Sequence, residues 1–495
     1  ALNHAETLQL IKPSAIPVSR PSARSPTYTF LDSALQRVAY GLVAKDDRRR
    51  LHAKAAEALA SLQSTDGAIA EQVAAHHEHA ANRRQSKRWL GKAAWDAIAQ
   101  GDTTKAIKYL EAALADAPEG GGSQHSKHHL LQLLGIQIAL ARGNASEQFF
   151  EIYQRSLETA SNSSQGQRSG SEFRALWGLQ SYHLVRGEIR AALTIGRLLM
   201  TRFVETNRDE GADCSRSTNH YKLLIHRMHG LAVMLNGQLD EAERHYDAVL
   251  DIYEMDRDAS LRFSFGSDQA ALALAHRCWT RTLRGDGVGA KEDAIRARRQ
   301  AERLAHAHTS VHVLGVLALA ALQCRSRTEA ALAARETRAI AVEKNFPYWI
   351  AWSDVVLAAS QSDPTGDPMR TMAAACARYE AQDAQQLLPV AYCALGEAGL
   401  AAGRLDEAHK AIETGLGFTR RGGVIVQQPR LKLVQSRILR ALGDESGAAA
   451  SWEDAYGGSK ASGATLFLRQ VTLDGCIHSG GQEQIMWQRR YHAAL

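Results

Sequence analysis

The stretch that decides the fold is Asn236-Gly237-Gln238-Leu239-Asp240-Glu241-Ala242-Glu243-Arg244-His245-Tyr246. A tight turn at Gly237 opens a helix in which Ala242 stands five residues after the glycine and Tyr246 four residues later. Residues four apart share a helical face, so a small side chain followed by a large one lets this helix approach the one before the turn. The stretch therefore predicts two packed helices joined by a glycine turn.

The same phase recurs along the chain. An alanine five residues after a turn glycine is followed four positions later by a large apolar residue in three more places: Ala106 with Leu110, Ala408 with Ile412, and Ala448 with Trp452. The turn glycines are Gly101, Gly143, Gly187, Gly237, Gly285, Gly403 and Gly443; the first five lie 42 to 50 residues apart and the last two 40 apart. Recurring helix-turn-helix units signal a solenoid. We expect an all-α fold, a right-handed solenoid of degenerate tetratricopeptide-like helix pairs, with units longer than the usual ~34 residues.

Composition agrees with a repeat rather than one compact core. The chain has 495 residues, of which 45% are hydrophobic but only 6% aromatic, and 10 are prolines. No run approaches the ~18 apolar residues of a membrane span. The net charge of +6 is small beside 59 basic and 53 acidic residues, so it does not by itself indicate nucleic-acid binding. We expect a cytoplasmic protein with no membrane contact and no nucleic-acid partner.

The cysteines are spread along the chain without a C-x-x-C pair, which suits neither a disulfide framework nor a zinc site. We interpret all six as reduced thiols of the core: Cys214, Cys278, Cys324, Cys376, Cys393 and Cys476.

Breaks in the helical pattern suggest how the chain is divided. Residues 11–29 carry four prolines and no helical period, so they read as a loop or linker, and helix begins after Leu31. Stretches rich in glycine and serine predict exposed loops between repeats at 120–123, 161–171 and 362–368. We expect a first segment with a linker at 1–44, then repeats at 45–120, 121–365 and 366–495.

The N-terminal part resembles a known family. It reads Phe30-Leu31-Asp32-Ser33-Ala34-Leu35-Gln36-Arg37-Val38-Ala39-Tyr40, then Arg48-Arg49-Arg50-Leu51-His52 and Ala56-Glu57-Ala58-Leu59. This text is similar to the end of the ATPase module in large bacterial signal-transduction ATPases with numerous domains, many of which are fused to a class III adenylate or guanylate cyclase. The stretches 70–77 and 346–351 also look like their repeat regions, whereas Asp32 stands where we expect His or Arg in that family.

The resemblance implies that the chain is the C-terminal tetratricopeptide-repeat region of such a protein. Residues 1–44 would then hold the end of a winged-helix segment associated with the ATPase. ATP and Mg²⁺ would be bound only by domains preceding Ala1.

Within the chain itself we expect no catalytic residue, cofactor or metal. No G-x-x-x-x-G-K-[ST] occurs, and Gly285-Asp286-Gly287-Val288-Gly289 lacks the lysine of a phosphate loop, so we interpret it as an interhelical turn. His76, His77 and His79 share a helical neighbourhood, and His226 with His229, and His306 with His308 and His312, are spaced similarly. Sequence shows no further ligands for any of these groups, and we interpret them as structural.

A solenoid of helix pairs presents one face of each first helix on a concave surface. Phasing on the turn glycines places seven residues there as candidates for partner binding: Arg88, Trp95, Arg227, Met234, Arg430, Arg437 and Arg440. Arginine forks favour carboxylates, such as an acidic peptide or a chain terminus. The alternative is that these arginines cover apolar neighbours or pair with glutamates of adjacent repeats.

We therefore expect a non-catalytic sensor and protein-interaction region that regulates an attached ATPase or nucleotide cyclase. Its partner would be a protein, a peptide or the parent's own ATPase domain. The alternatives are an inducer- or partner-sensing arm of an ATP-dependent transcription regulator, and a free-standing repeat scaffold.

Overall fold

The computed structural model describes residues 10–13, 28–61, 67–115, 124–161, 165–205, 215–360, 367–478 and 481–494, together with Ala5 and Leu8. The chain divides into two compact units, one formed by residues 1–100 with 108–115 and the other by residues 101–107 with 116–495. Among the described helices, none is both long and apolar enough to cross a membrane.

The N-terminal unit begins with a short antiparallel ladder of β1 (Ile11–Pro13) and β2 (Tyr28–Phe30), in which Ile11 lies opposite Phe30. The prediction of a loop over 11–29 was therefore wrong at both ends of that stretch, and its middle lies outside the described residues. Helices α2 (Ser33–Leu42), α3 (Lys45–Ala60), α4 (Gly67–His79) and α5 (Arg83–Ala99) follow. Asp32 caps α2 by accepting a hydrogen bond from the Ala34 N–H at 2.7 Å, a local reason for an acidic residue at this position.

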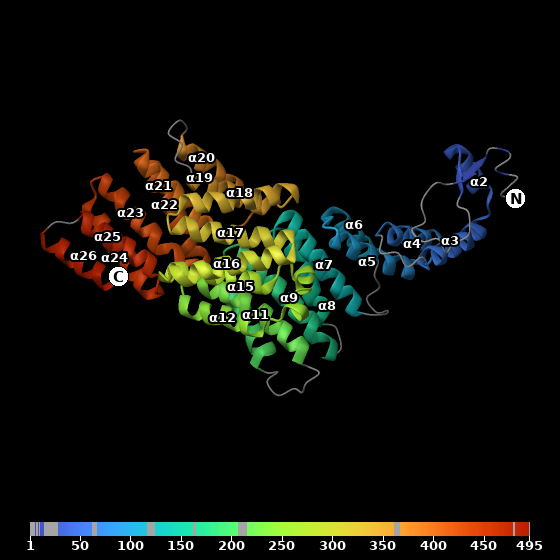
Figure 1. Ribbon diagram of the computed structural model, residues 1–495, viewed down its shortest axis with the longest axis horizontal. Helices are drawn as coiled ribbons and strands as arrows, with labels where there is room; N and C mark the ends of the chain where they lie inside the picture. Colours follow the sequence, from blue (N-terminus) through green and yellow to red (C-terminus); the bar gives the residue numbers. More distant parts are fainter. Residues whose placement is uncertain are drawn as a thin grey trace. The chain divides into compact units, whose positions relative to one another are not determined.

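Helix α6 (Thr103–Leu114) falls across the division between the units. In the larger unit, first and second helices alternate (Figure 1). The first helices are α7 (Gln124–Arg142), α9 (Gln165–Val185), α11 (Ser215–Leu235), α15 (Gln269–Arg284), α17 (Ala307–Gln323), α19 (Pro347–Ser360), α21 (Leu388–Ala401), α23 (Gln428–Ala441) and α25 (Thr465–His478). The second helices are α8 (Glu147–Ser161), α10 (Ile189–Met200), α12 (Leu239–Ile252), α16 (Gly287–Leu304), α18 (Arg327–Glu343), α20 (Pro368–Glu380), α22 (Leu405–Gly422), α24 (Glu445–Ser462) and α26 (Gly481–Ala494). Short elements lie between some pairs: η1 (Thr201–Glu205), α13 (Met255–Asp258), α14 (Leu261–Phe265) and η2 (Ile425–Gln427).

The turn chemistry read from the sequence is confirmed. All seven turn glycines have positive φ, between 71° and 87°, the left-handed region that only glycine enters without steric cost. The alanines five residues later, Ala106, Ala242, Ala408 and Ala448, are fully buried, and the large residues that follow them are at most 1% exposed. The helices therefore pair as the glycine–alanine phase predicts.

A continuous cluster of buried side chains runs through the larger unit from Ile136 in α7 to Phe467 in α25. Each first helix packs against its own second helix and against the next first helix, which is the arrangement of a solenoid. The chain is thus an all-α solenoid of degenerate tetratricopeptide-like helix pairs.

Later repeats of the larger unit return to earlier ones. The backbone N–H groups of Gln385 and Gln386 both donate to the Val185 carbonyl oxygen, at 2.8 and 3.2 Å. Gly422, at the end of α22, lies so close to the Gly187 turn that a Cβ at position 422 would stand 2.1 Å from the Gly187 oxygen. The coil of helices therefore closes on itself, and its first helices face an interior.

Two interpretations of loops and cysteines need correction. The stretch 161–171 is not an exposed loop, because α9 begins at Gln165 and Ser171 is 4% exposed. Residues 162–164 lie outside the described residues, as do residues 120–123 and 361–366 of the other two predicted loops.

Cys278, Cys376 and Cys393 are buried free thiols, but Cys324 is exposed and Cys476 is half-buried. The helical period placed Cys324 inside, whereas it caps the end of α17 at a turn that sequence did not reveal. Cys214 lies outside the described residues.

Candidate functional site

A partly open cavity of about 120 Å³ lies inside the larger unit. Its walls come from six successive first helices, α7, α9, α11, α15, α17 and α19, together with Gln386 and Leu387 from the segment that closes the coil. Most of the lining is apolar or aromatic. The cavity is therefore formed by the concave face of the solenoid, where the repeat geometry places a binding surface.

Four tryptophans dominate the aromatic part of the lining: Trp177, Trp279, Trp349 and Trp352. The indole N–H of Trp279 donates to Gln323 Oε1 at 2.8 Å, and that of Trp352 donates to the Gly315 carbonyl oxygen at 3.2 Å. Gly315 also makes room for Trp349, because a Cβ there would stand 2.4 Å from its ring. These contacts hold the rings in place before any ligand arrives.

Three polar atoms of the lining are buried without a hydrogen-bond partner among the described residues. They are Nε1 of Trp177, a donor, Nδ1 of His276, and Oε1 of Gln386, an acceptor in an amide whose Nε2 donates to the Tyr348 hydroxyl at 3.0 Å. A buried polar atom without a partner costs about 1–3 kcal/mol. A ligand with an acceptor beside the Trp177 indole and a donor beside the Gln386 amide oxygen would recover that cost at these two atoms.

Arg227, on α11, is the only residue with a formal charge among the described residues that line the cavity. It is 5% exposed, and its Nε donates to the amide Oε1 of Gln269 at 3.0 Å. Among the described residues no carboxylate comes within ion-pair distance of it. Burial lowers the pKa of the guanidinium to about 10, so the group remains a cation at neutral pH without an anion.

The histidines that line the cavity are uncharged at neutral pH. Burial lowers the pKa of His276 to about 3 and that of His308 to about 4, and it holds the pKa of His312 well below its usual value. All three imidazoles are therefore neutral at neutral pH. They offer hydrogen bonds and ring faces, while Arg227 supplies the only charge.

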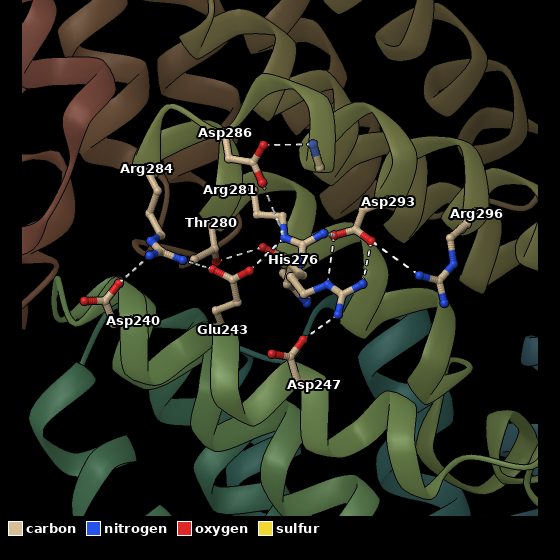
Figure 2. A network of polar contacts seen from close by, with 12 residues as sticks. Asp240, Glu243, Asp247, His276, Thr280, Arg281, Arg284, Asp286, Asp293 and Arg296 are labelled. Atoms are coloured by element: carbon tan, nitrogen blue, oxygen red, sulfur yellow. Dashed lines mark hydrogen bonds and ion pairs between the residues drawn. The ribbon is translucent and has the colours of Figure 1, made fainter. Parts of the chain in front are cut away.

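Arg277, another buried arginine of the larger unit, has carboxylate partners that neutralise its charge. Arg277 on α15 donates to Asp293 of α16 through Nε at 2.8 Å and through a terminal nitrogen at 2.6 Å, and it also pairs with Asp247 of α12. Figure 2 shows the network around Asp293, which is fully buried and also accepts from Arg281 at 3.1 Å. The network fixes α15, and with it His276 and Trp279, against α12 and α16.

The structure places the seven predicted binding residues in three regions. Arg88 is exposed and Trp95 half-buried on α5 of the N-terminal unit. Arg227 lies in the cavity, whereas Met234 on the same helix is fully buried and does not line it. The prediction therefore placed Arg227 on the face where the cavity forms.

Arg430, Arg437 and Arg440 all lie on α23 and already have partners. Arg430 pairs with Glu397 at 3.1 Å, and Arg437 with Asp474 at 2.7 Å. Arg440 pairs with Glu445 at 3.2 Å and stacks over the ring of Trp452 at 4.0 Å. The Arg430–Glu397 pair and the stacking of Arg440 on Trp452 are contacts of the kinds that the alternative expected, whereas the partner of Arg437 is an aspartate. A role for the three arginines in partner binding remains a prediction.

The glycine-rich stretch 285–289 is a helix cap. Gly285 ends α15 with φ of +81°, and the Asp286 carboxylate accepts from the Gly289 N–H at 2.9 Å at the start of α16. The carboxylate occupies the place where a phosphate loop would hold its anion, so the interpretation as an interhelical turn is confirmed.

Sequence reasoning missed the tryptophans of the cavity. Trp349 falls in a stretch quoted for its family resemblance, and His308 and His312 were weighed only as metal ligands. A large aromatic residue on the first helix of successive repeats is the signal that points to them.

Comparisons with known proteins add little to this description. No family model matches the chain, and no curated protein matches it. Similar solved structures include a Rap protein complexed with competence and sporulation factor (12% identity, 83% of this chain and 97% of that chain, TM-score 0.48), aspartyl phosphate phosphatase F from Bacillus subtilis (11%, 82% and 93%, 0.39) and yeast Tom70 (12%, 91% and 96%, 0.31). The class of the protein therefore follows from its own geometry, as a helical-repeat solenoid with an internal cavity. None of the comparisons supports an attached ATPase or cyclase.

Proposed function

We propose that this chain is a ligand-sensing helical-repeat region whose internal cavity binds a carboxylate beside a single aromatic or branched apolar group, as at the carboxyl terminus of a peptide. The observation that carries the proposal is Arg227, a buried cation at the cavity wall with no carboxylate partner among the described residues. A buried charge is costly unless it is paired, and a ligand carboxylate would pair it bidentately.

The size of the cavity limits what accompanies the carboxylate. An engineered apolar cavity of about 150 Å³ holds one benzene molecule. A cavity of about 120 Å³ therefore admits one side chain, with the rest of a peptide outside. The free indole N–H of Trp177 and the free amide oxygen of Gln386 suit the acceptor and donor of a terminal peptide unit.

The cavity also suggests how binding could be transmitted. Its lining joins early repeats to Gln386 and Leu387, which belong to the segment that closes the coil. A ligand that contacts both favours the closed coil over an open one, which is a population shift. In the resemblance described above, the element that responds would be an attached ATPase or cyclase in the bacterial cytoplasm. The chain itself would be a non-catalytic sensor with a protein or peptide as its partner.

Two small probes test the proposal on the full chain. N-acetylphenylalanine and N-acetylphenylalaninamide differ only in the terminal group, carboxylate in the first and uncharged amide in the second. We expect the acid to quench tryptophan fluorescence and raise the Tm, and the amide to do neither. Isothermal titration calorimetry then gives the affinity of each.

Arg227→Met keeps an unbranched apolar stem and removes the charge, and it should abolish binding of the acid. Arg303→Met, at an exposed position of α16, is the matched control and should bind as the parent chain does. Equal binding of acid and amide, or full binding by Arg227→Met, would contradict the proposal. So would the absence of any binding of the acid to the parent chain.

A further inference from the structure

A cluster of imidazoles and a carboxylate lies between α11 and α12, outside the residues that line the cavity. His229 on α11 and His245 on α12 each stand eight residues from the turn glycine Gly237, so antiparallel packing places them opposite each other. Glu241 lies one helical turn before His245, and His226 lies one turn before His229. Gly230 allows the close approach, because a Cβ there would be only 3.0 Å from the Cβ of His245.

The side chains of His229, Glu241 and His245 converge. One potential ligand atom from each lies within 4.8 Å of the other two, and Nε2 of His245 is 3.9 Å from Oε1 of Glu241. Nδ1 of His229 has no hydrogen-bond partner among the described residues and lies against Gly196 of α10, where a Cβ would stand 2.3 Å from it. Ligand atoms around a tetrahedral zinc ion are about 3.3 Å apart, so small side-chain rotations close the cluster on an ion.

His226 determines which nitrogen of His245 is free. The Nδ1 atoms of the two rings are 2.9 Å apart, so one of them carries a proton and donates it to the other. When His245 is the donor, its Nε2 keeps a lone pair on the side of Glu241. A ligating histidine is commonly oriented by such a hydrogen bond through its second nitrogen.

The cluster is accessible to an ion. The Glu241 side chain is 39% exposed and that of His245 13%, so the cluster can be reached from solvent.

We propose that His229, Glu241 and His245 form a binding site for a divalent transition-metal ion of the zinc class, with His226 as a positioning residue and water completing the coordination. Two imidazoles and one carboxylate are the donor set of open zinc sites, whereas Mg²⁺ and Ca²⁺ prefer oxygen ligands alone. The ion would clamp the two helices of one repeat. The site is independent of carboxylate binding at Arg227.

Metal binding is measured on the full chain after treatment with a chelator and dialysis. Co²⁺ is the spectroscopic probe, since tetrahedral Co²⁺ absorbs strongly in the visible, and Zn²⁺ affinity follows from competition with a chromophoric chelator. We expect one equivalent of either ion per chain and a rise in Tm on addition of Zn²⁺. His229→Ala, His245→Ala and Glu241→Gln should each lose the equivalent.

His226→Ala should weaken binding about 10- to 100-fold, the range found for partners of metal ligands. The Co²⁺ spectrum should keep its shape, because the ligands are unchanged, and His226→Asn should restore affinity in part by accepting from His245. A changed spectrum would instead make His226 a ligand.

The N-terminal unit supplies the control. His52 and His76 are paired there, Nδ1 to Nδ1, at 2.8 Å, and His79 stacks on His52, but these residues do not meet the geometry of the α11–α12 cluster. His52→Ala should leave the single equivalent intact. The proposal fails if the parent chain binds no stoichiometric Co²⁺ or Zn²⁺, or if His52→Ala removes binding that His245→Ala and Glu241→Gln retain. If an alanine variant does not fold, metal binding by Glu241→Gln tests the proposal in its place.

Discussion

At the scale of single residues, Arg227 and Arg277 both carry a buried guanidinium, but they differ in their hydrogen-bond partners. Arg277 is held by Asp293 and Asp247, and its removal leaves the fully buried Asp293 with fewer partners. Arg227 has only an amide partner, Gln269, and no carboxylate depends on it. The two arginines therefore differ in what their loss would cost.

Arg277→Met should destabilise the chain by about 3–5 kcal/mol, because it leaves a buried carboxylate short of its counter-charge. Arg227→Met should change stability by less than about 2 kcal/mol, because removal of an uncompensated buried charge offsets the loss of the hydrogen bond to Oε1 of the buried Gln269. Urea denaturation of both variants measures the difference. A large loss of stability in Arg227→Met would mean that the arginine is structural rather than a ligand anchor.

The neutral histidines of the cavity predict sensitivity to acid. The pKa values of His276 and His308 are about 3 and about 4 in the folded chain, against about 6.5 when unfolded. Between these values the unfolded chain binds more protons, so the free energy of unfolding should fall as the pH drops from about 6.5 towards 4, by up to about 1.4 kcal/mol per pH unit for each histidine. Above pH 6.5 the two should contribute no slope.

Urea denaturation at pH 7.5, 6.5 and 5.5 tests this expectation. His276→Gln, which cannot be protonated, should flatten the decrease below pH 6.5. A stability that stays constant or rises on acidification would show that these imidazoles are protonated in the folded chain.

At the scale of elements, the turn between α17 and α18 departs from the others. Arg325 occupies it with φ of 60°, whereas the other turns between first and second helices that the structure describes in the larger unit carry glycine. The sequence therefore shows no glycine signal between Gly285 and Gly403, although two helix pairs lie there. A non-glycine residue in the left-handed region costs about 1–2 kcal/mol.

Arg325→Gly should stabilise the chain by about 1 kcal/mol, since the strain is relieved and only an exposed ion pair with Glu397, at 3.6 Å, is lost. Gly403→Ala is the inverse change at a turn with φ of +71° and open space around the site of a Cβ, and it should cost about 1 kcal/mol. Thermal unfolding followed by circular dichroism measures both. Stabilities that move together in the two variants would contradict the account of the turns.

At the scale of the larger unit, coil closure depends on close approach at two glycines. Gly422 meets the Gly187 carbonyl directly, and next to this contact the Arg190 guanidinium donates to the Arg420 carbonyl oxygen at 3.2 Å. These residues are more than 200 positions apart in sequence. Such contacts decide whether the first helices enclose a cavity or line an open groove.

Gly422→Ala should lower the Tm and speed hydrogen exchange at the Gln385 and Gln386 amides, because a Cβ would meet backbone at 2.1 Å and the two turns would have to separate. Gly457→Ala is the control: Gly457 is also helical, with nothing within 4 Å of its Cβ site, and the change should stabilise by up to about 1 kcal/mol. Normal protection of the two amides in Gly422→Ala would show that closure does not depend on this contact.

The sequence by itself determined the helix pairs. The glycine turns and the alanine five residues later are local signals, because a positive φ and the face of a helix depend only on neighbouring residues. The same phasing put Arg227 on the inner face. It did not reveal the turn at Arg325, where the backbone adopts the left-handed conformation without glycine.

Only the tertiary structure decided what the helix faces meet. Trp177, Trp279 and Trp349 come from three repeats and line one cavity because the coil closes at Val185 and Gln385, a contact between segments 200 residues apart. His229 and His245 meet Glu241 only because α11 and α12 pack at a particular depth. Periodicity specifies which side chains face inward, but the curvature that brings distant ones together results from the sum of many small packing contacts, which no single stretch of sequence contains.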